Sequence, residues 1–159
     1  MKRKIPLILL ILWIAFIFYN SIKSAPDSIM ESSIIVDGVK NIISFIYNHN
    51  VPLSITTYLN ETFETNLRDF AHFFEFFVLY ILIYLNIKHL NMCGLKLLLN
   101  GLYLSLFVSV IDETIQLSSI GRSFQVTDII TDMLGSLLAF VVIYIISKYI
   151  KKDYGVCSV

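Results

Sequence analysis

Acidic and basic side chains, one histidine and one glutamine gather at the ends of long apolar stretches, where charged groups are rare. They are Arg68, Asp69, His72, Glu75, Asp112, Glu113, Gln116, Arg122, Asp128 and Asp132. A charged group inside a membrane costs about 2.5–3.5 kcal/mol on insertion scales, so it is a candidate for function. An imidazole with carboxylates can transfer protons or bind a divalent cation of the zinc, manganese or magnesium kind, and arginines can bind an anion.

The charges in this set do not balance. Six carboxylates (Asp69, Glu75, Asp112, Glu113, Asp128 and Asp132) face two arginines and at most one imidazolium, which leaves at least three negative charges without a partner. Some carboxylates are then protonated, or a divalent cation or a cationic ligand is bound. Asp112 and Glu113 need such a partner most, because they end a predicted helix, where the dipole disfavours negative charge.

The composition indicates which elements position these residues. The chain has 159 residues, of which 57% are hydrophobic and 15% charged, and its mean hydropathy is +0.76. Soluble domains carry about 25% charged residues, so these values favour an integral membrane protein. Twelve basic residues balance twelve acidic ones, which excludes a basic nucleic-acid-binding protein. Two cysteines are too few for a disulfide framework.

Four apolar stretches predict membrane-spanning helices, at residues 5–21, 70–87, 97–117 and 129–147. We therefore expect an all-α fold, a four-helix transmembrane bundle that forms one domain over residues 1–159. The first stretch could also be a cleaved secretory signal, but its bulky aromatic residues and Lys23 favour a retained helix. Trp13, within it, is expected to be an ordinary aromatic residue of the membrane interface.

The loop between the first two spans, residues 22–69, contains an amphipathic helical segment too polar to cross the membrane. Its apolar positions are Ile35, Val39, Ile42, Ile43 and Ile46. A second, weaker helical pattern follows Pro52. We expect the amphipathic segment to lie on the outer membrane surface.

The distribution of basic residues predicts the orientation. With both termini in the cytoplasm, eight basic residues lie inside and four outside, which agrees with the positive-inside rule for a plasma-membrane protein. The polar set then meets near the outer boundary of the bilayer. Asp69 and Asp128 can alternatively cap helix N-termini, and Arg68 and Arg122 can alternatively anchor lipid headgroups.

The helical phase places the polar residues on contact faces. At about 100° per residue, Arg68, His72 and Glu75 share one narrow face. The two later spans each carry a stripe of small and polar residues about four positions apart: Gly101, Ser105, Ser109, Asp112 and Gln116; and Asp128, Asp132, Gly135 and Ala139. Small residues at this spacing let membrane helices pack closely, so the carboxylates should point into the bundle.

At these residues the chain resembles the VanZ-like family of small bacterial membrane proteins. The resemblance rests on the arginine-led His72-Phe-Phe-Glu75, the Asp112-Glu113-x-x-Gln116 run, the Gly121-Arg122 turn and Asp128-x-x-x-Asp132-x-x-Gly135, in this order. Two positions differ from the usual family pattern. Asp69 replaces a lysine and Asp132 replaces an asparagine, and both changes make the set more acidic.

The resemblance implies a role in the Gram-positive cell envelope and in resistance to teicoplanin-type lipoglycopeptide antibiotics. It supplies a site without an established reaction. The positions that match the family are Arg68, His72, Glu75, Asp112, Glu113, Gln116, Arg122 and Asp128, with Asp132 at a matched position of altered residue type.

Two functional hypotheses follow. In the first, the polar set is an outer-leaflet pocket that binds an amphipathic ligand: a lipoglycopeptide, a lipid-linked wall precursor or an anionic lipid headgroup. In the second, the protein is a metal-dependent or acid–base transferase or hydrolase that acts on a lipid-linked group. Glu113 or Glu75 is then the base, His72 a ligand or proton shuttle, and Arg122 a phosphate clamp. The candidate metal ligands are His72, Glu75, Glu113 and Asp132.

A proton-coupled carrier fits less well, because no ionisable residue continues the path through the inner halves of the later spans.

Overall fold

The fold is helical throughout the part of the chain that the structure covers. A computed structural model describes residues 4–23, 25–47, 52, 55, 64–88, 90 and 94–150. Within these residues the regular elements are all helices, which confirms the predicted all-α class. They are α1 (Lys4–Ile22), α2 (Ala25–Ile46), α4 (Glu64–Ile87), α5 (Gly94–Gln116) and α6 (Val126–Ile150).

Four of these helices are long and apolar enough to cross a membrane, over Lys4–Ile22, Asn66–Ile87, Gly94–Gln116 and Val126–Tyr149. The chain is therefore a multi-pass membrane protein. The helices extend beyond most of the predicted spans, and the largest difference is at α4, which begins at Glu64. Arg68 and Asp69 consequently lie within the helix and not ahead of it.

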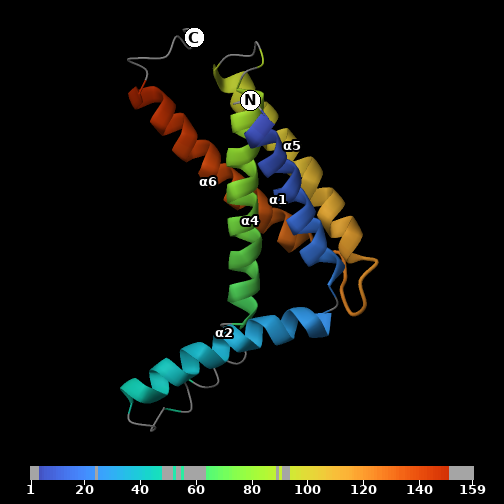
Figure 1. Cartoon of the computed structure of the whole chain (residues 1–159), viewed down its shortest axis with the longest axis vertical. Coiled ribbons are helices and arrows are strands. Elements are labelled where there is room, and N and C mark those ends of the chain that lie inside the picture. Colours follow the sequence, from blue (N-terminus) through green and yellow to red (C-terminus); the bar gives the residue numbers. More distant parts are fainter. Residues whose placement is uncertain are drawn as a thin grey trace.

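The four spanning helices form one bundle. α1, α4 and α5 run side by side, while α6 crosses them at a marked tilt, and α1 begins at the same end of the bundle at which α6 ends (Figure 1). α4 packs most extensively against α6. Gly135 allows this close approach, since a β-carbon added there would lie 2.1 Å from the Phe73 carbonyl oxygen.

The apolar core lies where α1, α4 and α5 meet. Ile17, Phe76, Leu79, Ile83 and Val108 form a buried cluster. Many large apolar side chains elsewhere face outward; Phe107 is 65% exposed, for example. A bundle with an apolar exterior and polar groups in its interior is what a lipid environment requires, because lipid offers no hydrogen-bond partners.

α2 lies crosswise at one end of the bundle, beside the beginning of α4 (Figure 1). We call this the α2 end. Of the predicted apolar stripe, Val39 and Ile43 are half-buried, while Ile35, Ile42 and Ile46 are exposed. Val36 provides the buried contact instead. Apart from Pro52 and Ile55, the second predicted helical pattern lies outside the described residues.

Candidate functional site

The polar residues singled out from the sequence gather between the helices near the α2 end. Nine side chains make up this set, which we call the polar cluster: Arg68, His72 and Glu75 from α4; Asp112, Glu113 and Gln116 from α5; Arg122 from the following turn; and Asp128 and Asp132 from α6. Four of its members are fully buried, namely Asp112, Glu113, Gln116 and Asp132. The polar residues of the predicted stripes on α5 and α6 therefore face the interior of the bundle, as expected.

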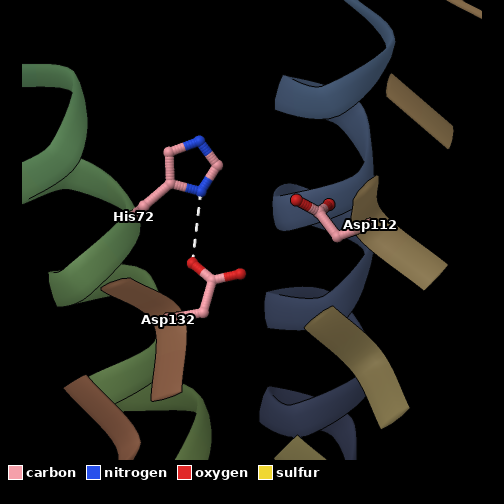
Figure 2. A group of neighbouring side chains, drawn as sticks. All are labelled: His72, Asp112 and Asp132. Carbon is pink, nitrogen blue, oxygen red and sulfur yellow. Dashed lines mark ion pairs between the residues drawn. The ribbon is translucent and has the colours of Figure 1, made fainter. Parts of the chain in front are cut away.

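Three helices each bring one side chain to the centre of the polar cluster. His72 of α4 faces Asp132 of α6, with Nδ1 and Oδ1 3.3 Å apart. Asp112 points from α5 toward this pair (Figure 2). One ligand atom from each of the three side chains lies within 4.8 Å of the other two.

Short hydroxyl and amide contacts hold the two aspartates. Ser109 Oγ donates to Asp132 Oδ2 at 2.7 Å. Asp112 accepts hydrogen bonds from Ser21 Oγ and from Gln116 Nε2, the latter at 3.2 Å. Both carboxylates are therefore held in fixed orientations by neighbouring helices.

α1 contributes to the site at its last turn. Ser21 binds Asp112, and Ser119 Oγ in turn donates to the carbonyl oxygens of Ser21 and Ile22, at 2.8 and 3.0 Å. The final carbonyls of a helix have no partner within it, so Ser119 caps α1. This contact fixes the end of α1 against the turn that follows α5.

Glu75 and Glu113 have hydrogen-bond partners outside the central group. Glu75, half-buried, accepts a hydrogen bond of 2.8 Å from Asn20 Nδ2. Glu113 Oε2 accepts the backbone N–H of Gln125 at 2.9 Å, directly before α6 begins. The N-terminal end of a helix carries partial positive charge, so α6 stabilises the carboxylate that the end of α5 disfavours.

Gly121 shapes the turn between α5 and α6. Its φ of 77° lies in the left-handed region that favours glycine. The Arg122 N–H then donates back to the Ser119 carbonyl at 3.2 Å. This turn brings Arg122 to the polar cluster.

Two arginines lie near each other at the α2 end. Arg68 Nη2 pairs with Asp128 Oδ2 at 2.6 Å, and its side chain is 36% exposed. Burial, and then the charge of Arg68, lower the pKa of the Arg122 guanidinium, against the opposing effect of the neighbouring carboxylates Asp112, Asp128 and Glu113. The two guanidinium groups are thus close enough to repel each other.

An apolar hollow of about 260 Å³ lies along the bundle surface between α5 and α6. We call it the α5–α6 groove; its lining is Leu102, Ile129, Ile130, Met133, Leu134 and Leu137. It begins at Ile129, the residue after Asp128. An apolar groove therefore starts beside the residue that pairs with Arg68.

Several residues of the site were missed by sequence reasoning, and one was placed wrongly. Trp13 is not only an interfacial aromatic residue, since its indole N–H donates to the Glu75 carbonyl at 2.9 Å. Asn20 and Ser21 were overlooked, although polar residues at the end of an apolar span offer a usable signal. Asp69, by contrast, is exposed.

A model of the VanZ/LLP1 family matches residues 6–147. The chain belongs to the VanZ/LLP1 family. No curated protein and no solved structure matches it. The motif residues on which the resemblance to this family rests are far apart in the sequence. In this VanZ/LLP1 chain they lie together at one end of the bundle.

The polar cluster of this VanZ/LLP1 chain offers groups for two kinds of chemistry. Its centre has an imidazole and two buried carboxylates, a donor set suited to protons or to a divalent cation. Its edge has two arginines, suited to an anionic group, beside an apolar groove.

Proposed function

We propose that this VanZ/LLP1 protein binds an amphipathic ligand, with its anionic head at Arg68 and Arg122 and its apolar chain in the α5–α6 groove. The observation that carries the proposal is the adjacency of these two features. The groove begins at Ile129, next to Asp128, which pairs with Arg68. Ligand sites typically combine an apolar cavity with a few polar groups that fix orientation.

The charge at the edge of the polar cluster supports an anionic head. An anion between Arg68 and Arg122 relieves the repulsion that contributes to the lowered pKa of Arg122. Guanidinium groups bind phosphate and carboxylate oxygens in paired hydrogen bonds. Arg68 Nε is buried without a hydrogen-bond partner among the described residues, so its N–H can donate to a bound anion.

We place the α2 end on the outer face of the plasma membrane, with both termini in the cytoplasm. The positive-inside rule supports this orientation, since it puts eight basic residues inside and four outside. The ligand then comes from the outer leaflet. An anionic lipid, a lipid-linked wall precursor and a lipoglycopeptide share the required chemistry of an anionic group on an apolar chain.

Binding to the protein in nanodiscs tests the proposal. The probes are phosphatidylglycerol, a polyprenyl phosphate and teicoplanin, each titrated separately so that the three sources are distinguished. We expect Arg122→Gln and the groove-filling Leu134→Trp each to weaken binding of the preferred probe at least tenfold. The matched control Lys40→Gln, on α2, should bind like the wild type. Equal affinity of all variants, or no binding of any probe, overturns the proposal.

Drug susceptibility tests the role in resistance. A teicoplanin-sensitive Gram-positive host receives an empty vector, the wild-type chain or Glu113→Gln, with equal membrane levels of the two proteins. We expect the wild type to lower susceptibility and Glu113→Gln not to do so. No difference among the three strains means that the family's association with resistance does not extend to this chain.

A second candidate function is a transferase or hydrolase acting on a lipid-linked group. Its support is the central group of His72, Asp112 and Asp132, whose ligand atoms lie within 4.8 Å of one another. Release of phosphate from a polyprenyl diphosphate by purified protein tests it. Activity lost in His72→Gln and kept in Asp69→Asn favours this function, and absence of turnover of this substrate by the wild type speaks against it.

A further inference from the structure

His72, Asp112 and Asp132 come from three different helices and meet in the interior of the bundle. Asp112 and Asp132 are fully buried and His72 is 9% exposed. Their ligand atoms lie within 4.8 Å of one another, a separation that a single coordinated ion can bridge. Figure 2 shows the three side chains converging on a common space.

Two of these buried polar atoms have no hydrogen-bond partner among the described residues. They are His72 Nδ1 and Asp132 Oδ1. They face each other at 3.3 Å, an ion pair when His72 is protonated, without the alignment of a hydrogen bond. A buried polar atom without a hydrogen bond costs about 1–3 kcal/mol, and a metal ion between a neutral imidazole and the carboxylate would satisfy both atoms.

The other hydrogen bonds of the two aspartates leave lone pairs on their carboxylate oxygens free for such a partner. Asp132 Oδ2 accepts a hydrogen bond from Ser109, and each oxygen of Asp112 accepts one, from Ser21 or from Gln116. A carboxylate has about four lone-pair positions, so both groups can still coordinate an ion. Hydrogen bonds of this kind orient metal ligands in known sites.

The charge of the surroundings favours a cation. The polar cluster contains five carboxylates: Glu75, Asp112, Glu113, Asp128 and Asp132. Arg68 and Arg122 are its two arginines, and Arg68 is paired with Asp128. A divalent ion beside Asp112 and Asp132 reduces the negative excess in a region of low dielectric constant.

We infer that His72, Asp112 and Asp132 form a binding site for a divalent transition-metal ion of the Mn²⁺ or Zn²⁺ kind. One imidazole nitrogen with two carboxylates suits these ions, whereas Ca²⁺ takes oxygen ligands only. The ion joins α4, α5 and α6, and three protein ligands leave a coordination position for water or a ligand. The sequence had suggested Glu75 and Glu113 as ligands; in the structure Asp112 takes their place. The inference does not depend on the proposed lipid ligand.

Direct metal binding to the full chain in detergent tests the inference. The protein is treated with EDTA, dialysed and titrated with MnCl2 or ZnCl2 by calorimetry. We expect one ion per chain and at least a tenfold loss of affinity in Asp132→Asn and Asp112→Asn. The control Asp69→Asn removes an exposed carboxylate of α4 and should bind like the wild type. Absence of binding of both metals, or equal affinity in all variants, overturns the inference.

A measurement on the wild type alone covers variants that fail to fold. Metal should raise the thermal unfolding midpoint of the EDTA-treated protein, because a ligand that binds only the native state stabilises it. The electron spin echo of the Mn²⁺-bound protein should show coupling to a histidine nitrogen. An unchanged midpoint, or a spectrum without nitrogen coupling, overturns the inference.

Discussion

Gly135 of α6 lies directly against the backbone of Phe73 of α4. A β-carbon at Gly135 would lie 2.1 Å from the Phe73 carbonyl oxygen, closer than any two such atoms can approach. His72, next to Phe73, and Asp132, one turn before Gly135, are the pair that faces each other in the polar cluster. This close contact between α4 and α6 therefore helps to set the distance between two site residues.

Gly135→Ala should push α4 and α6 apart and destabilise the bundle. Overpacking of this kind costs about 1–3 kcal/mol, and the obstacle is backbone, which cannot rotate away. We expect a lower thermal unfolding midpoint in detergent, followed by circular dichroism. Gly38→Ala on α2 is the matched control, because an added β-carbon there meets nothing within 4 Å. Equal shifts in the two variants would contradict the argument.

Trp13→Phe should weaken the contact between α1 and α4. The change keeps an aromatic ring but removes the indole N–H that donates to the Glu75 carbonyl at 2.9 Å. A hydrogen bond of this kind contributes about 0.5–1.5 kcal/mol, so the unfolding midpoint should fall moderately. Tyr19→Phe, at an exposed position of the same helix, removes one hydroxyl and should leave the midpoint unchanged. A larger loss in Tyr19→Phe than in Trp13→Phe would refute the assignment.

Arg68 and Asp128 should be energetically coupled. Their ion pair is 2.6 Å long, with the Asp128 side chain 6% exposed and that of Arg68 36% exposed. The partial exposure screens the interaction, so we expect a coupling free energy of about 0.5–2 kcal/mol from a double-mutant cycle with Arg68→Gln and Asp128→Asn.

The control cycle uses Lys40 and Asp37 on α2, which pair at 2.9 Å but are 34% and 65% exposed. Its coupling should be at most about 0.5 kcal/mol, since exposed ion pairs contribute little. If the exposed pair couples as strongly as Arg68 and Asp128, burial is not what strengthens the contact.

Ser109→Ala should lower the metal affinity of the central site without removing a ligand. Ser109 Oγ holds Asp132 Oδ2 at 2.7 Å, and loss of such orienting groups typically costs about 10–100-fold in affinity. Calorimetric titration with MnCl2 measures the effect. Ser118→Ala removes an exposed hydroxyl near the end of α5 and should bind like the wild type. An unchanged affinity in Ser109→Ala would show that this hydroxyl does not position Asp132.

The amino-acid sequence by itself determined the number of spans, their approximate limits and the direction of the polar stripes. This is possible because helix length and angular position follow directly from residue order. His72, Asp112 and Asp132 were expected to face inward at one end of the bundle, and they are buried there.

Only the tertiary structure decided which of the inward-facing groups lie close to one another and which are held by other residues. That choice depends on helix tilt, rotation and separation, which arise from contacts between helices, such as the one at Gly135. Glu75 and Glu113 are therefore held by Asn20 and by the Gln125 backbone.

The contribution of α1 was likewise a matter of packing. Ser21 reaches Asp112 across 91 positions in the sequence, and such a pairing has no local signal. The sequence determined which side chains are available at this depth of the membrane; the packing of four helices determined that His72, Asp112 and Asp132 meet.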